Sequence, residues 1–191
     1  KANFMEGQSQ ESSSISPAEH LILNIEKCDS LYLETKLKQD NVDPNYISKI
    51  GDRLIVLAAK RGIPKFIELL VNEGADINLK SENGDSAITV AARVGDSEFV
   101  ETLLALNANI NSRTKRQETP LLISIKNGNE KLANRLILAG ADIRNIDGNK
   151  NNADDYSRVM QLKSTVSLIK DVSKVDSRGI SFTHLNEISQ T

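Results

Sequence analysis

The chain has 191 residues, of which 39% are hydrophobic and 26% are charged, and its formal net charge is −2. This near-neutral charge argues against general nucleic-acid binding, which requires a basic surface. A single cysteine, Cys28, excludes an internal disulfide framework, and no run of about 18 apolar residues predicts a membrane span. Because no charged-then-apolar N-terminal signal is present either, we expect an intracellular, cytoplasmic protein.

The N-terminal part of the chain changes from a polar segment to helical patterns. Residues 1–16 are polar and rich in serine and glutamine, which predicts disorder. Residues 18–28 and 30–38 each carry apolar side chains at helical spacing, so they predict two amphipathic helices. The chain begins with Lys1 rather than methionine, and we therefore expect it to be a fragment of a longer protein.

A five-residue phrase occurs three times at intervals of 33 residues. It reads Gly-Ala-Asp-Ile-Asn over residues 74–78, Asn-Ala-Asn-Ile-Asn over 107–111 and Gly-Ala-Asp-Ile-Arg over 140–144. The same interval aligns Gly62 with Gly95. A fixed period of this length is typical of stacked copies of one supersecondary unit rather than of a single globular core.

Each copy predicts two short helices followed by an extended loop. In the middle copy, Ser86 is a suitable N-cap for the small apolar residues 87–93, and Gly95 follows as a C-terminal stop. The second helix carries apolar side chains at positions i, i+1, i+4 and i+5. Asn107 ends it, because glycine and asparagine enter the left-handed conformation at the lowest cost. The polar residues 109–117 then predict a protruding hairpin loop.

These features resemble ankyrin repeats. The third copy contains Thr-Pro-Leu-Leu over residues 119–122, close to the Thr-Pro-Leu-His signature of that family. Paired alanines and the Gly-Ala-Asp-Ile-Asn ending also match, strongly over residues 51–145. Arg53 departs from the pattern where the family prefers threonine, which predicts weaker capping of the following helix.

The resemblance implies an all-α repeat solenoid in which helix-turn-helix pairs carry protruding hairpin loops. Residues 41–45 and the segment from Asp147 onward fit degenerate copies, so we expect three regular repeats and two capping repeats. This organisation divides the chain into a disordered segment (1–16), an ankyrin repeat domain (17–172) and a C-terminal tail (173–191).

The sequence shows no pattern typical of catalysis or metal binding. His20 and His184 are far apart, and with Cys28 they form no zinc-binding spacing. Asp154 and Asp155 are adjacent acids, but neighbouring side chains on a helix diverge by about 100° and cannot easily flank one substrate. Both are better explained as charges that complement a helix N-terminus. We therefore expect no enzymatic activity in this segment, no cofactor and no metal.

The resemblance also implies a binding surface, formed by the hairpin tips and the first helix of each repeat. Transferred by register, the residues expected to contact a partner are Lys60, Arg61, Lys80, Glu82, Asn83, Arg93, Arg113, Lys115, Arg116, Lys126 and Asn127. Two columns with the 33-residue period stand out at opposite ends of the first helices. The basic column contains Lys60, Arg93 and Lys126, and the acidic column contains Asp52, Asp85 and Glu118.

Two interpretations of these positions stay open. The columns either complement the helix dipoles, which we favour, or form a basic strip, extended by the cations of the loop at 113–116, that recognises an acidic or phosphorylated peptide. Asn78 and Asn111 occupy a position that is hydroxylated in some ankyrin proteins, and a hydrogen-bonded turn residue is the favoured interpretation there.

The expected function is that of a non-catalytic interaction module, monomeric, that binds a protein partner in a concave groove. An alternative is the targeting domain of a larger enzyme or of a secreted bacterial effector in the host cytosol, which the richness in Asn, Lys and Ile suggests. A third interpretation is a purely structural spacer.

Overall fold

A computed structural model describes residues 17, 20–21, 30–39 and 41–177. The disorder predicted for residues 1–16, the helix predicted over 18–28 and most of the tail at 173–191 therefore fall largely outside the described residues. Within them, nine helices have defined bounds, and the only strand-like feature in that part of the chain is an isolated antiparallel bridge between Ile47 and Arg53. The all-α repeat solenoid that the resemblance implies is confirmed.

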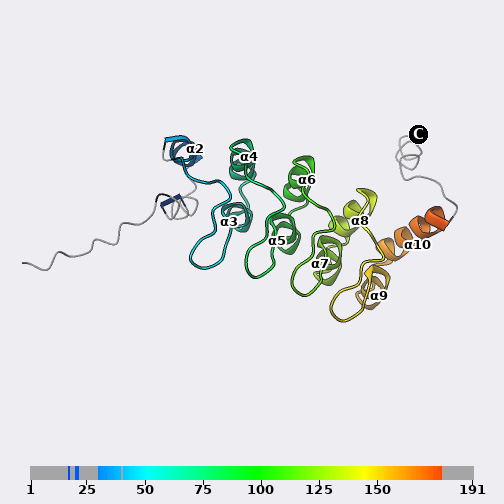
Figure 1. Cartoon of the computed structure of the whole chain (residues 1–191). Coiled ribbons are helices and arrows are strands. Elements are labelled where there is room, and N and C mark those ends of the chain that lie inside the picture. The colour runs from blue at the N-terminus through cyan, green and yellow to red at the C-terminus, as the bar shows by residue number, and fades with distance from the viewer. Residues whose placement is uncertain (1–16, 18–19, 22–29, 40, 178–191) are drawn as a thin grey trace, which may run out of the picture.

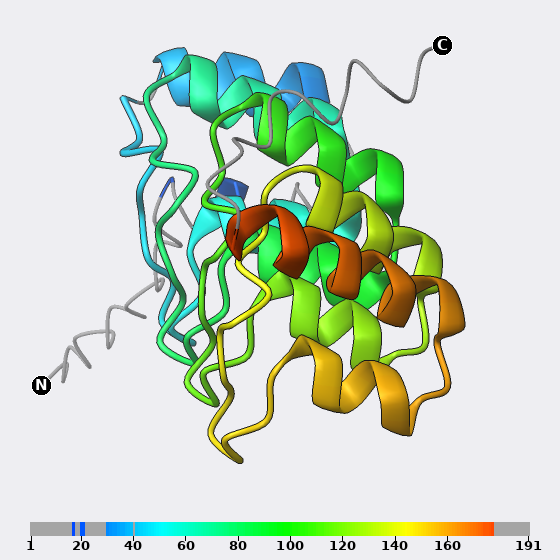
Figure 2. The same cartoon turned by 90° about the vertical axis from the view of Figure 1, so that its right-hand side faces the viewer.

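The helices form two layers along the stack (Figure 1). One layer, the inner helices, contains α3 (Leu54–Arg61), α5 (Ala87–Val94), α7 (Pro120–Lys126) and α9 (Ala153–Val159). The other layer, the outer helices, contains α2 (Ser30–Gln39), α4 (Pro64–Asn72), α6 (Ser97–Ala105), α8 (Glu130–Leu138) and α10 (Lys163–Ser177). The hairpin loops extend from the inner layer and lie side by side in the view turned by 90° (Figure 2).

Small residues allow the inner helices to pack closely along the stack. One register position holds Ala58, Ala91, Ser124 and Ser157, and all four side chains are fully buried. The two serine hydroxyls donate to backbone carbonyls of their own helices, so their burial leaves no unpaired donor. From α2 to α8, neighbouring outer helices contact one another less extensively than neighbouring inner helices do.

The turns after the outer helices have the predicted left-handed residues. Gly74 and Gly140 have φ angles of 94° and 93°, and Asn107 at the equivalent position has a φ of 65°. Asparagine is one of the few residues other than glycine that tolerates this region. The prediction that Asn107 replaces glycine in this role is confirmed.

Asparagine side chains join successive repeats at the end of each phrase. The side-chain oxygens of Asn45, Asn78 and Asn111 accept hydrogen bonds, of 2.7–2.9 Å, from the backbone N–H groups of residues 76, 109 and 142 in the next repeat. The hydrogen-bonded interpretation of Asn78 and Asn111 is confirmed, with the partner in the following repeat. Arg144 holds this position in the last phrase, where the series ends.

The last outer helix is longer than the others. α10 has 15 residues and continues to Ser177, so the division drawn between residues 172 and 173 falls inside this helix. Its N-terminus is held by the preceding repeat, because a Glu130 carboxylate oxygen accepts from the backbone N–H groups of Ser164 and Thr165. Val172 is buried and extends the core into the last helix.

Candidate functional site

Hydrogen bonds fix the four hairpin loops in a row beside the inner helices. The same bond closes each loop, from the backbone N–H of Ser48, Ser81, Thr114 and Asp147 to the carbonyl four residues later. Adjacent tips are also joined, because the backbone N–H of Glu82 donates to Gly51 and that of Gly148 donates to Arg116. The tips and inner helices thus form the two walls of a groove.

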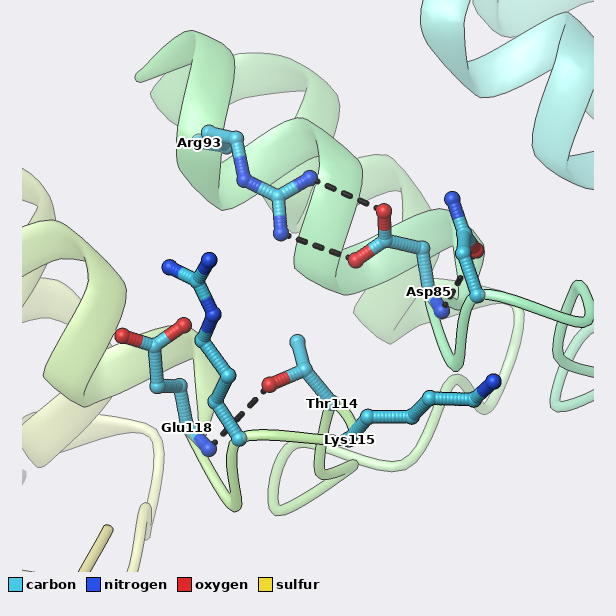
Figure 3. Close-up of a pocket in the computed structure, with 7 residues that line it drawn as sticks. Asp85, Arg93, Thr114, Lys115 and Glu118 are labelled. Atoms are coloured by element: carbon cyan, nitrogen blue, oxygen red, sulfur yellow. Dashed lines mark hydrogen bonds and ion pairs between the residues drawn. The ribbon is translucent and has the colours of Figure 1, made fainter. Parts of the chain in front are cut away.

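Two adjoining hollows lie in this groove. The first, drawn in Figure 3, has a volume of about 490 Å³ and is lined by Asn83, Asp85, Arg93, Thr114, Lys115, Arg116 and Glu118. The second has a volume of about 400 Å³ and is lined by Arg116, Glu118, Lys126, Asp147, Gly148 and Asn149. Arg116 and Glu118 border both hollows, so the two form one continuous surface.

The structure brings the basic and acidic columns together. Lys60 lies 2.6 Å from the Asp52 carboxylate and Lys126 lies 2.5 Å from that of Glu118. Arg93 donates two hydrogen bonds to Asp85, which Figure 3 shows as a parallel pair. Each base therefore neutralises the acid of its own repeat, and the basic column does not present a strip of unpaired charge.

The pKa shifts at the groove follow from these pairs. The hydrogen bond to Asp85 raises the pKa of Arg93. Burial acts to lower the pKa of Lys126, but the hydrogen bond and charge of Glu118, together with Tyr156 and Asp147, outweigh it and leave this pKa raised. Both cations stay charged at neutral pH.

Asp147 forms a buried polar centre beside the second hollow. It is 5% exposed, and it accepts hydrogen bonds from the Tyr156 hydroxyl at 2.6 Å and from the backbone N–H groups of Asn149 and Asn151. The Lys126 ammonium lies 3.6 Å from its carboxylate and 5.0 Å from the Tyr156 ring centroid. Burial acts to raise the pKa of Asp147, but these donors and the lysine charge prevail and lower it.

Several other residues of the predicted set connect neighbouring segments. The Lys80 ammonium donates to the Arg113 carbonyl, and the Arg113 guanidinium donates to Gln117 and Asn145. The Asn127 side chain donates to the Arg93 carbonyl, across to the preceding repeat. Arg61 and Glu82 are exposed, and Asn83 borders the first hollow.

Sequence reasoning did not include three residues that line the second hollow in the binding set. They are Asp147, Gly148 and Asn149. The 33-residue register could have found two of them, since Gly148 and Asn149 align with Lys115 and Arg116. Asp147 is a buried loop-closing residue, which a search for exposed side chains passes over.

In the described ranges, no group of three or more His, Cys, Asp or Glu side chains is arranged to hold a metal ion. His184 and Cys28 lie outside those ranges. Among the helices whose residues are described, none combines the length and apolar character needed to cross a membrane.

The comparison with known proteins agrees with the geometry. A family model for ankyrin repeats, in three copies, matches residues 55–147, from the first turn of α3 to the fourth hairpin loop. No curated protein gives a significant match to the chain. Ankyrin repeats are generally non-catalytic modules for protein–protein interaction. The chain therefore contains ankyrin repeats over residues 55–147.

Proposed function

We propose that the groove between the hairpin tips and the inner helices binds an extended segment of a protein partner. The observation that carries this proposal is the continuity of the two hollows past Arg116 and Glu118, with volumes of about 490 and 400 Å³. Together they offer a polar channel across the last three loops of the row. The chain itself contributes binding and no chemical step.

The groove walls are held in place before a partner arrives. The loop backbones are closed by repeated hydrogen bonds, and the inner-helix cations are held by their ion pairs. A preorganised surface loses little conformational entropy on association, so more of the contact energy contributes to affinity. A groove built in this way suits an interaction module better than a spacer, which needs no such channel.

An acidic or phosphorylated partner segment fits the exposed cations of the groove. Lys115 and Arg116 are both exposed on the third hairpin tip. The same groove would serve a free-standing module or a targeting domain attached to an enzyme, so the proposal is independent of what the full protein contains.

Site-specific photo-crosslinking tests the location of binding. A photoreactive amino acid at Asn149, which lines the second hollow, is compared with the same residue at Lys131, an exposed position on outer helix α8. We expect a partner from cell lysate to be crosslinked at position 149 and not at position 131. Crosslinking only at position 131, or at neither position, would contradict the proposal.

A further inference from the structure

The third hairpin tip differs from the other loops of the row in its charge. Its two tip residues are Lys115 and Arg116, and the register positions in the other loops hold Lys49 and Ile50, Glu82 and Asn83, and Gly148 and Asn149. Of the four described loops, only this one carries two cations at the tip. Both side chains are exposed.

These two cations also differ from the rest of the groove in having no partner. The column cations are paired with carboxylates, Lys80 donates to the Arg113 carbonyl, and Arg113 donates to Asn145 of the next repeat. In the part of the chain that the structure describes, no hydrogen bond or ion pair is formed by the side chain of Lys115 or Arg116. Their charges are therefore available to a ligand.

The charge balance of the first hollow points in the same direction. Three cations line it, Arg93, Lys115 and Arg116, against two carboxylates, Asp85 and Glu118. Each carboxylate is already neutralised, Asp85 by Arg93 and Glu118 by Lys126. The hollow thus presents unpaired positive charge with no unpaired negative charge.

The backbone of the third tip is joined to the fourth tip, which fixes the points from which the two cationic side chains extend. The Arg116 carbonyl accepts from the backbone N–H of Gly148 at 2.8 Å. A Cβ atom on Gly148 would lie 3.2 Å from this carbonyl oxygen, so a side chain there would crowd the joint. Arg116 itself lines both hollows.

We infer that the third hairpin tip is an anion-binding site, at which Lys115 and Arg116 receive a carboxylate or phosphoryl side chain of the partner segment. The inference rests on the proposed function and names the chemistry that the groove selects. The anionic group of the partner is thus recognised by the third tip and not by the basic column. Carboxylate and phosphoryl oxygens accept charge-assisted hydrogen bonds from lysine and arginine, and these are stronger than hydrogen bonds between neutral groups.

A peptide titration of the full chain tests this site. Short Gly/Ser peptides that carry glutamate, phosphoserine or glutamine at the centre are added while the backbone amide signals are followed by NMR. We expect one or both anionic peptides to shift the signals of residues 115–116 and 148–149, and the glutamine peptide to shift none. The anionic peptide that binds more tightly shows whether the site prefers a carboxylate or a phosphoryl group.

Two charge-matched double variants provide the controls. Lys115→Gln with Arg116→Gln removes two positive charges at the tip, and Lys131→Gln with Lys170→Gln removes two from the outer helices. We expect the affinity for the anionic peptide to fall by about tenfold or more in the tip variant and to stay unchanged in the outer variant. Equal affinities in the two variants, shifts spread over the whole surface, or no shift with either anionic peptide would overturn the inference.

The anion site and the proposed groove binding can be supported or contradicted independently of each other. A partner crosslinked at position 149 whose capture is unaffected by the tip variant would support groove binding and overturn the anion site. A localised peptide shift without any crosslinked partner would support the anion site and contradict the proposed function.

Discussion

The Arg93 guanidinium donates two hydrogen bonds, of 2.8 and 3.1 Å, to the Asp85 carboxylate eight residues earlier. This contact runs the length of α5, from its last turn to the residue before its N-cap. The Lys60–Asp52 and Lys126–Glu118 pairs repeat it in the adjacent inner helices. Charges that helix-dipole reasoning assigns to separate helix ends thus form one ion pair in each repeat, and the groove floor is close to neutral.

Truncating the two partners of this pair should have unequal effects. The Asp85 side chain is 12% exposed and that of Arg93 is 47% exposed. Arg93→Gln leaves a largely buried carboxylate without its cation and should cost about 1–3 kcal/mol of unfolding free energy. Asp85→Asn leaves a cation that water can solvate and should cost less than about 1 kcal/mol. Urea denaturation of both single variants and the double variant measures the difference. Equal costs with no coupling would contradict the pairing.

The asparagine series should contribute measurably to the contact between repeats. Asn111→Ala removes the acceptor for the Asp142 backbone N–H and should cost about 1 kcal/mol, the usual contribution of one hydrogen bond. Lys131→Ala is the control, because this position on α8 is exposed, and it should change stability by less than about 0.5 kcal/mol. Thermal or urea unfolding distinguishes the two variants. A control as destabilised as the Asn111 variant would argue against the series.

The 33-residue repeat predicts much of the fold but only part of the groove. A 33-residue register shows which residues share a position in each repeat, and this was enough for the helix pairs, the left-handed Asn107 and the loops. It does not show how a long side chain bends within a repeat, so the pairing of Arg93 with Asp85 was missed. Nor does it show bonds between unlike positions, such as that from Arg113 to Asn145.

The two loop arginines should therefore differ in their effect on stability. Arg113 is partly buried and donates to Gln117 and Asn145, so Arg113→Ala should cost about 1 kcal/mol. Arg116 is exposed, and Arg116→Ala should change the unfolding free energy by less than about 0.5 kcal/mol. Urea denaturation midpoints at constant slope measure both. A loss of stability in the Arg116 variant comparable to that of Arg113 would mean that the third tip is a structural element.

The core predicted from helical spacing should dominate stability. Leu103 and Leu136 are fully buried between the inner and outer layers, and either change to alanine should cost about 2–5 kcal/mol. Leu138 lies in the same helix as Leu136 but is 49% exposed, so Leu138→Ala should cost less than about 1 kcal/mol. Denaturant unfolding ranks the three variants. A loss below about 1 kcal/mol for either buried leucine would contradict the packing.

The Asp147 centre should make stability depend on pH at the acidic end. Because the folded state lowers the pKa of Asp147, its ionised form stabilises the fold above the unfolded pKa of about 3.9. This contribution should decrease as the pH falls below about 4 and disappear once the folded carboxyl is protonated. Asp147→Asn should therefore reduce stability at neutral pH, and its deficit relative to the parent should shrink as the pH is lowered.

Lys126 provides the opposite sign at the alkaline end. Its raised pKa means that the charged lysine stabilises the fold below the unfolded pKa of about 10.4, and this contribution should be lost as the pH rises above that value. Urea midpoints of the parent, Asp147→Asn and Lys126→Gln, measured across pH, test both signs. The deficit of Asp147→Asn should be smallest in acid and that of Lys126→Gln smallest in strong alkali. A constant deficit for either variant would show that its charge state does not stabilise the fold, even though the side chain contributes to packing.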